Sequence, residues 1–300
     1  MARRGRRRTR SAQRGLTLVL VLWLLAALTL IAASVAANSR QGVRAASDNR
    51  TMASSEALCD GAIVRALAVM VAEGGDPGVG HEFEFRLADV PVGVSIVPAN
   101  AYINVNTADE PLLVRLFQHG AGLDPSRALQ LARRVMDWRD SDDEALPDGA
   151  EAPDYVAAGV SFRPRNGRFE TIDDLMQVLG LDFLVFDRIR SLVVAGGRDA
   201  QVNALAASPR VLTVLADGDD RVARAIVETR RERGRSTDLS ALPRAYVGDS
   251  PTRVMRVDAR IVLPDQRTIV RTQWIVLGGA GGQLPWLQLS REPARFGSGA

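Results

Sequence analysis

The chain has 300 residues and a formal net charge of +3, and 46% of its residues are hydrophobic, enough for an ordinary buried core. Its single cysteine, Cys59, excludes an internal disulfide and a cysteine-rich metal site. Seven arginines and no acidic residue lie within residues 1–15, so the remainder of the chain carries a net charge of −4. Because binding to nucleic acid depends on clustered positive charge, we expect no nucleic-acid partner for this remainder.

An uncharged apolar stretch, residues 16–37, follows the arginines. It is long enough to cross the hydrocarbon core of a membrane, about 30 Å thick, as a helix. Basic residues stay on the cytoplasmic side of a membrane, so we expect residues 1–15 inside and the chain from residue 38 onward outside the cytoplasm. The sequence therefore predicts a single-pass membrane protein whose bulk is exported.

The residues at the boundary between the basic and apolar segments distinguish between two kinds of leader sequence. An ordinary secretory signal has a shorter apolar region that ends in a small-x-small cleavage site, which residues 33–37 supply only loosely. Here a glycine stands at the boundary itself, in the run Arg14-Gly15-Leu16-Thr17. This arrangement resembles the type IV prepilin leader. The resemblance implies cleavage after Gly15 by a prepilin peptidase, which also methylates the new N-terminus at Leu16.

Beyond the apolar stretch, helical spacing of apolar residues continues to about Ala72, where glycines and a proline end it. The stretch 82–87 alternates charged and apolar side chains, and residues 92–97 form a second short strand, so a β-hairpin is predicted. Residues 255–263 and 270–276 alternate in the same way on either side of a turn, which predicts a second hairpin. We therefore expect one long helix and a small antiparallel sheet.

Between the two hairpins, residues 101–242 have a helical pattern that contains two similar segments. Residues 103–108 carry an asparagine-bearing strand end before a helix, and residues 202–204 begin the same pattern 99 positions later. Thr107 and Ser208 are the expected caps of the helices that follow. The order of these elements predicts an α+β fold in which an all-helical block is inserted into the sheet domain.

A third helical segment, residues 169–181, predicts a helix, a glycine turn at Gly180 and a second helix. This pattern also occurs in helix-hairpin-helix modules, which grip DNA phosphates with backbone amides. No basic cluster flanks the turn, and three aspartates crowd it instead: Asp173, Asp174 and Asp182. These charges favour a packing motif in which Gly180 permits a tight turn.

The segment richest in ionisable groups runs from Asp137 to Asp154 and carries eight carboxylates with few nearby cations. In a compact loop these charges repel one another, and a bound hard cation removes the repulsion. Calcium accepts about six to eight oxygens and tolerates irregular loops, whereas zinc prefers histidine or cysteine. A solvated acidic loop and a glycosidase acid–base pair are the alternatives, the latter without any sign of a sugar cleft. The candidate calcium ligands are Asp140, Asp142, Asp143, Glu151 and Asp154.

No motif argues for catalysis. Neither of the two histidines, His81 and His119, lies in the spacing with which a helix presents metal ligands. The sequence contains neither the Gly-x-Ser-x-Gly elbow of hydrolases nor a glycine loop that binds phosphate. We therefore expect a structural or assembly protein rather than an enzyme, with no catalytic residues.

Several motifs, in order along nearly the whole chain, resemble those of the minor pseudopilin K family of type II secretion systems. The resemblance implies a pilin-like long N-terminal helix packed on a small antiparallel sheet, with a large all-α insertion of the helix-hairpin-helix or SAM-like kind. The motifs are Leu22-Trp23 behind the glycine leader, residues 103–108, residues 137–144, Gly149-Ala150-Glu151 ahead of Tyr155, and residues 166–175.

The resemblance implies a function as well as a fold. Members of this family cap the tip of a periplasmic pseudopilus and initiate its assembly for protein export across the outer membrane. The implied partners are the minor pseudopilins I and J, the rest of the pseudopilus, the prepilin peptidase and the bacterial inner membrane. The family also binds calcium in the helical domain, which supports the metal prediction for the acidic loop.

These predictions divide the chain into consecutive parts. They are a basic prepilin leader at 1–15, a transmembrane half-helix at 16–37, a periplasmic helix and first strands at 38–100, the helical insertion with its acidic loop at 101–242, the C-terminal strands at 243–290, and a disordered tail at 291–300.

One position agrees with the family and one segment departs from it. Most pilin-like proteins carry a glutamate at the fifth residue after the cleavage site, but K-type members lack it, and here that residue is Leu20. In the second repeat, Leu205-Ala206-Ala207 stands where Asn-Thr-Ala is expected, so no role is assigned to Asn203. The competing hypotheses are a membrane-anchored helix-hairpin-helix DNA receptor and a minor type IV pilin.

Overall fold

The computed structural model describes the backbone of residues 12–278 and 285–297, and the side chains of residues 20–31, 48–278 and 285–297. The chain divides into two compact units, residues 1–57 and residues 58–300. The predicted basic leader and the predicted cleavage site between Gly15 and Leu16 lie outside the residues whose side chains are described.

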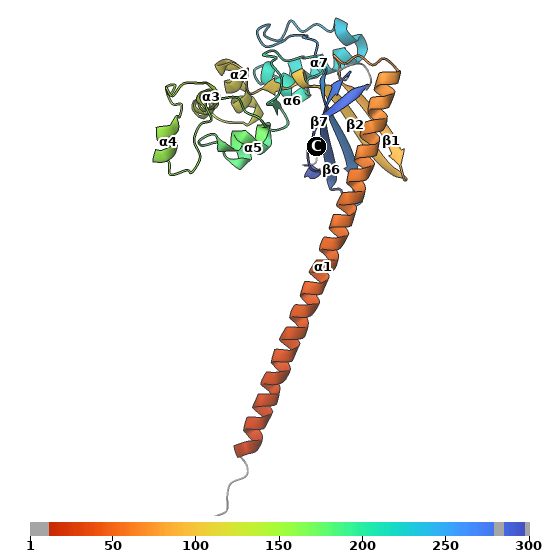
Figure 1. Cartoon of the computed structure of the whole chain (residues 1–300), viewed down its shortest axis with the longest axis vertical. Helices are drawn as coiled ribbons and strands as arrows, with labels where there is room; N and C mark the ends of the chain where they lie inside the picture. The colour runs from red at the N-terminus through yellow and green to blue at the C-terminus, as the bar shows by residue number, and fades with distance from the viewer. Residues whose placement is uncertain (1–11, 279–284, 298–300) are drawn as a thin grey trace, which may run out of the picture. The chain divides into compact units, whose positions relative to one another are not determined.

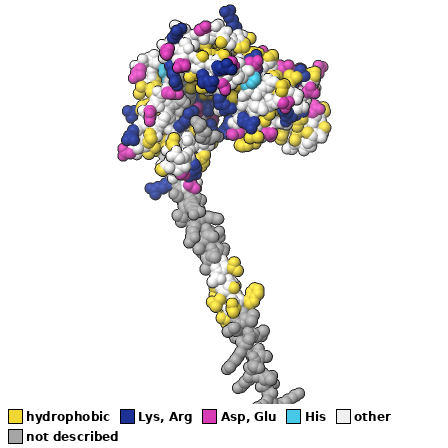
Figure 2. Space-filling model, turned by 180° about the vertical axis from the view of Figure 1, so that it is seen from behind, with side chains coloured by type: hydrophobic (Ala, Val, Ile, Leu, Met, Phe, Trp, Pro, Cys, Tyr) yellow, Lys and Arg dark blue, Asp and Glu magenta, His cyan; other side chains and the backbone are white. Residues whose placement is uncertain are grey.

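Helix α1 (Ala12–Ala72) is the longest element, with 61 residues, and ends where the sequence predicted (Figure 1). Within its first unit, the large apolar side chains described between residues 20 and 31 are all exposed, as the yellow side chains on the helix in Figure 2 show. In the described part of the chain, no helix has an apolar stretch long enough to cross a membrane. Residues 16–19 and 32–37 of the predicted span lie outside the described side chains.

Six antiparallel strands form one sheet, in which β1, β2, β5 and β6 lie side by side and β7 and β8 both pair with β6. The pairs β1–β2 and β5–β6 are the two predicted hairpins, with Phe83 opposite Val94 and Arg256 opposite Trp274. The strands are β1 (His81–Leu87), β2 (Val90–Pro98), β5 (Val254–Val262), β6 (Thr268–Leu277), β7 (Trp286–Arg291) and β8 (Arg295–Gly297).

The predicted disorder after Arg291 is wrong for the residues that the structure describes there. Strand β8 pairs with β6, with Phe296 opposite Ile269. The guanidinium of Arg267 lies 4.7 Å from the centre of the Phe296 ring, which fixes the strand further. The short tail has no apolar alternation of its own, so its order comes from the β6 edge, which local sequence does not reveal. Residues 298–300 lie outside the described residues.

The last turns of α1 pack on the sheet through one apolar face. Residues at helical spacing on this face are fully or almost fully buried: Cys59, Ala62, Ile63, Ala66, Leu67 and Met70. Beside them, the Asp60 carboxylate accepts hydrogen bonds from Arg271 Nε (3.0 Å), Gln273 Nε2 (2.8 Å) and Arg291 Nη1 (3.3 Å). The helix is therefore held by both apolar burial and a charged clamp.

The helical insertion leaves the sheet after β2 and returns at β5, and it has its own apolar core. Its two strands of two residues each, β3 (Ile103–Asn104) and β4 (Val193–Val194), pair in parallel. The α+β prediction with a helical insertion is thus confirmed. The helices are α2 (Glu110–Arg115), α3 (Pro125–Arg139), α4 (Ala152–Ala157), α5 (Phe183–Ile189), α6 (Pro209–Leu215) and α7 (Asp220–Arg233), with short 3-10 and π turns η1 (Ala99–Ala101), η2 (Leu116–Gly120), η3 (Ile172–Gln177) and η4 (Gly234–Ser236).

The two similar segments of the insertion make equivalent hydrogen bonds. Asn104 Oδ1 accepts from the amide of Asn106 (3.0 Å), and Asn203 Oδ1 accepts from the amide of Leu205 (3.1 Å). The side chain of Asn203 also donates to the Gly78 carbonyl (2.7 Å). Asn203 therefore has a structural role, which the sequence analysis did not assign to it.

An arginine closes each of these segments in the same manner. Arg139 donates to the carbonyls of Val105 and Ala108, and Arg230 donates to those of Ala204 and Ala207, which are the equivalent positions 99 residues later. The insertion thus contains two copies of one unit, each consisting of a strand end, an asparagine turn and a helix pair, with α4, η3, α5 and β4 between them.

One predicted helix cap is correct and the other is wrong. Ser208 Oγ accepts from the amide of Val211 at the start of α6, as predicted. Helix α2 is capped by Asp109, whose carboxylate accepts from the amide of Leu112 (3.0 Å), whereas Thr107 donates to the Asp199 carbonyl. Asp109 occupies the position equivalent to Ser208, and a carboxylate is as good a cap as a hydroxyl.

Candidate functional site

The acidic loop lies between the end of α3 and the start of α4, and Asp137 organises it. This aspartate is fully buried in the last turn of α3. Its two carboxylate oxygens accept from the amides of Leu146 (3.2 Å) and Ala150 (2.7 Å), which pins the loop onto the helix. A Cβ on Gly149 would lie 1.9 Å from Asp137 Oδ2, so only glycine fits there. Asp137 was not among the predicted metal ligands; its role depends on contacts across the loop.

Aromatic residues form the floor beneath this loop. The Trp138 ring stacks on the Phe169 ring with centroids 6.0 Å apart. The Tyr155 ring is tilted against the Trp138 ring, with centroids 6.1 Å apart. The Tyr155 hydroxyl accepts from the amide of Leu179 (2.9 Å) and so ties α4 to the glycine turn. The carboxylates of the loop consequently stand on a rigid, apolar base.

Glu151 is the most perturbed carboxylate of the loop. Its side chain is 2% exposed, and neither carboxylate oxygen has a hydrogen-bond partner among the described residues. Burial raises its pKa to about 7, and the nearby charges of Asp137, Asp140 and Asp143 raise it further in the same direction. A buried carboxylate without a partner is either protonated or bound to a cation.

Asp140 and Asp137 share this environment. Burial raises the pKa of Asp140, and Asp142 and Asp137 add to the effect. Burial likewise raises the pKa of Asp137, although the amides of Ala150 and Leu146 oppose that shift. One oxygen of Asp140 is also buried with no hydrogen-bond partner in the described structure. Three neighbouring carboxylates therefore compete for protons, which is the electrostatic condition that a cation relieves.

The other three predicted ligands are occupied by local hydrogen bonds. Asp142 Oδ1 accepts from the amide of Glu144 (3.0 Å), and Asp143 Oδ1 accepts from Asn166 Nδ2 (2.8 Å). Asp154 Oδ2 accepts from the amide of Glu151 (2.9 Å) at the start of α4. In the described residues, no three His, Cys, Asp or Glu side chains lie close enough together to hold a metal ion.

The donor chemistry of the loop nevertheless fits calcium. Its donors are hard oxygens, and Glu151 and Asp140 supply buried oxygens that nothing else in the described structure uses. Calcium takes backbone carbonyls and waters as well as carboxylates, so a full set of side-chain ligands is not required. The described histidines lie elsewhere: His81 contacts the Asp76 carbonyl (2.7 Å), and His119 pairs with Asp217 (3.2 Å).

The glycine turn near α5 is held by hydrogen bonds within the protein. Gly180 adopts a positive φ of 79°, as a tight turn requires. The amides of Leu179 and Leu181, which a phosphate would need, bond to the Tyr155 hydroxyl and the Val178 carbonyl. Arg134 donates to the Leu179 carbonyl (2.8 Å). The turn therefore serves packing, and the DNA-receptor hypothesis is not favoured.

The first part of the insertion matches a known family model. Residues 95–197, which include the acidic loop, match the family model described as "Type II secretion system (T2SS), protein K". Type II secretion system protein K of Klebsiella pneumoniae is 25% identical over 227 residues, covering 68% of this chain and 69% of that protein. The protein of the same description from Pectobacterium carotovorum subsp. carotovorum is 32% identical over 96 residues, covering 32% and 29%.

A solved structure supports the fold. One chain of the GspK-GspI-GspJ complex from the type 2 secretion system of enterotoxigenic Escherichia coli matches with a TM-score of 0.57 and 16% sequence identity. The match covers 86% of this chain and 99% of that chain. The pilin-like arrangement with its helical insertion is therefore shared with a known structure.

Proposed function

Because this chain belongs to the type II secretion system protein K family, we propose that it is a minor pseudopilin that initiates and caps the pseudopilus for protein export. The observation that carries the proposal is the protein K match over residues 95–197, where the insertion distinguishes this chain from a plain pilin fold. A minor type IV pilin would share the long helix and the sheet but not this insertion.

The partners of this pseudopilin are the minor pseudopilins I and J. The solved structure with the same fold is a complex with these two proteins. The role is one of assembly, in which the head supplies a shaped surface and no reacting group.

Co-purification tests the assignment directly. Expressed together, the full chain and the minor pseudopilins I and J should elute as one complex after detergent extraction. A version in which residues 101–242 are replaced by a short linker serves as the matched control, because it keeps the long helix. Elution of the full chain alone in the presence of both partners would contradict the proposal.

The leader supports a place in the bacterial inner membrane, with the N-terminus cytoplasmic and the bulk in the periplasm. The supporting observations are the arginines within residues 1–15 and the uncharged stretch 16–37. Intact mass and N-terminal sequencing of protein from bacterial membranes should give a chain that starts at N-methylated Leu16. A start near residue 38 would indicate an ordinary secreted protein, and an uncut chain would indicate a plain anchor.

Calcium binding by the acidic loop is the second part of the proposal. Glu151 and Asp140 would hold the ion with their unpartnered oxygens, and Asp142, Asp143 and Asp154 would complete the acidic shell. The ion would neutralise the loop and join the end of α3 to the start of α4.

Replacement of Asp140, Asp142 and Asp143 by Asn tests the calcium site. The wild-type protein should melt at a higher temperature in calcium than in chelator, because binding to the folded state alone adds stability. The triple variant should lose most of that difference. Thermal unfolding measures it, and equal melting temperatures of the wild-type protein in calcium and in chelator would refute calcium binding.

A further inference from the structure

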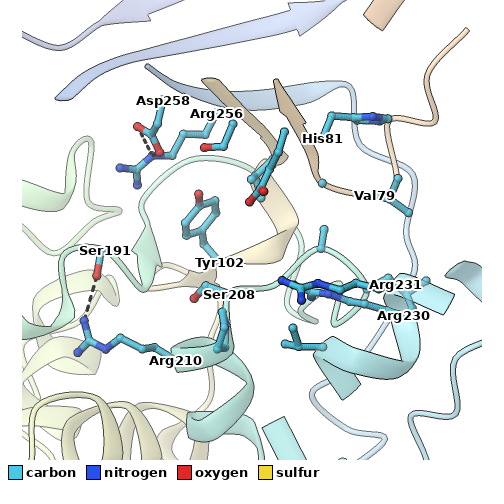
Figure 3. A pocket seen from close by; sticks show the side chains of 18 of the residues that line it. Val79, His81, Tyr102, Ser191, Ser208, Arg210, Arg230, Arg231, Arg256 and Asp258 are labelled. Carbon is cyan, nitrogen blue, oxygen red and sulfur yellow. Dashed lines mark hydrogen bonds and ion pairs between the residues drawn. The ribbon is translucent and has the colours of Figure 1, made fainter. Parts of the chain in front are cut away.

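A cleft of about 830 Å³ lies between the sheet and the helical insertion, away from the acidic loop. Its walls come from β1, β2 and β5 on one side and from α6 and α7 on the other (Figure 3). Five arginines and only two acidic residues line it: Arg210, Arg230, Arg231, Arg256 and Arg260, with Glu82 and Asp258. This balance is opposite in sign to the net charge of −4 that the chain carries beyond its leader.

One arginine of the cleft is neutralised within the protein. Arg256 Nε lies 3.0 Å from Asp258 Oδ2, and both side chains are buried. Although burial opposes its charge, the Asp258 carboxylate raises the pKa of Arg256. Its guanidinium also lies 5.3 Å from the centre of the Tyr102 ring. Arg256 is thus part of the cleft's framework.

The other four arginines have no carboxylate partner among the described residues. Arg210 donates to the carbonyls of Gly120 (3.2 Å) and Arg188 (2.8 Å), and Arg230 donates to those of Ala204 and Ala207. Carbonyl partners hold a guanidinium in place without cancelling its charge.

The last two arginines, Arg231 and Arg260, are exposed and make no hydrogen bond or ion pair in the described structure. Burial and then the charge of Arg231 lower the pKa of Arg230, whereas the Glu82 carboxylate, which also lines the cleft, partly opposes this shift.

The arrangement of these charges distinguishes an extended ligand from a small anion. The arginines stand on α6, α7 and β5, and Figure 3 shows Arg210, Arg256 and the neighbouring pair Arg230 and Arg231 at separate places around Tyr102. A phosphate ion reaches only one or two guanidinium groups, whereas an extended chain reaches all of them. The floor between them is apolar and includes Leu205, Ala206 and Val227. Such a surface suits alternating acidic and apolar side chains.

We infer that this cleft binds an extended acidic segment of a partner polypeptide. Carboxylates of the segment would pair with Arg210, Arg230, Arg231 and Arg260, and its apolar side chains would lie on the floor beside Tyr102. Because Arg210 and Arg230 are already fixed by carbonyl groups, binding costs little side-chain entropy there.

A fluorescence anisotropy titration tests the inference. The probe is a fluorescein-labelled short peptide of alternating Glu and Leu, added to the full chain in detergent micelles. The variant Arg231→Glu/Arg260→Glu reverses two cleft charges that have no structural partner, and Arg224→Glu/Arg163→Glu reverses two exposed charges outside the cleft. The cleft variant should raise the Kd by about tenfold or more, and the control should leave it unchanged. Added salt should weaken wild-type binding.

Three results would overturn the inference. One is the absence of saturable binding by the wild-type protein, and another is equal weakening in the control variant. The third is displacement of the peptide by inorganic phosphate or single-stranded DNA at comparable concentration, since general anion binding would explain it. A matched Lys/Leu peptide that failed to bind would support charge recognition by the cleft.

Discussion

If the acidic loop binds calcium as proposed, Glu151 should have opposite effects on stability with and without the ion, because its carboxylate is buried without a hydrogen-bond partner in the described structure. Its pKa is about 7 in the folded protein against an ordinary value of 4.5, so the folded state binds the proton more tightly than the unfolded state. The free energy of unfolding of the calcium-free protein should therefore fall as pH rises from about 4.5 to about 7. Above that range the ionised carboxylate is a constant cost unless a cation occupies the loop.

The variant Glu151→Gln separates these two effects. In chelator at pH 8 it should melt several degrees above the wild-type protein, because the buried charge is gone. In calcium it should melt below the wild-type protein, because a ligand is lost. Glu144→Gln, an exposed carboxylate of the same loop, should change neither value. A lower melting temperature for Glu151→Gln in both conditions would mean that the side chain is needed for packing alone.

At the scale of elements, the clamp on Asp60 fixes α1 on the sheet. Arg271, which donates to it, is almost fully buried, so loss of the carboxylate charge removes an ion pair from a site with little access to water. Asp60→Asn should lower the free energy of unfolding by about 2 kcal/mol, measured by urea denaturation. Glu73→Gln, an exposed position at the end of the same helix, should change it by less than about 0.5 kcal/mol. If both variants changed the free energy of unfolding by the same small amount, the packing of α1 on the sheet would depend on its apolar face alone.

The sequence predicted those helices and strands whose formation depends on residues close together in the chain. Alternation in β5 and β6 and the glycines after Ala72 were visible in the sequence, and the structure places those elements as expected. Strand β8 was missed because its order comes from the edge of β6. The Thr107 cap was wrong because a neighbouring aspartate competes for the same amides, and only the helix geometry decides between them.

The candidate site likewise has features that the sequence shows and features that only the folded chain shows. The acidic run was conspicuous in the sequence, but the burial of Glu151 and the hydrogen bonds of Asp137 across the loop depend on tertiary packing. The arginine cleft could not be seen in the sequence, since Arg210 and Arg260 are 50 positions apart and meet only when the insertion lies against the sheet.

For the whole molecule, Asn203 joins the insertion to the sheet domain. It is buried, and its amide donates to the Gly78 carbonyl in the loop ahead of β1. Asn203→Ala should lower the free energy of unfolding by about 1 kcal/mol, because the Gly78 carbonyl and the Leu205 amide, both part-buried, lose their partner. Gln201 is an exposed neighbour that also donates to backbone carbonyls, and Gln201→Ala should lower the free energy of unfolding by only a few tenths as much. Chemical denaturation measures both, and an unchanged value for Asn203→Ala would show that its hydrogen bond to Gly78 adds nothing to stability.

The insertion leaves the sheet after Pro98 and returns at β5, where Met255 faces Pro98 across the paired strands. Entry and exit are therefore neighbours. A pull applied along a fibre through α1 would pass into the strands of the sheet and from strand to strand, while the insertion would hang as a side branch that carries no tension. A change in the size of the insertion would therefore leave the strand pairing that carries the load unchanged.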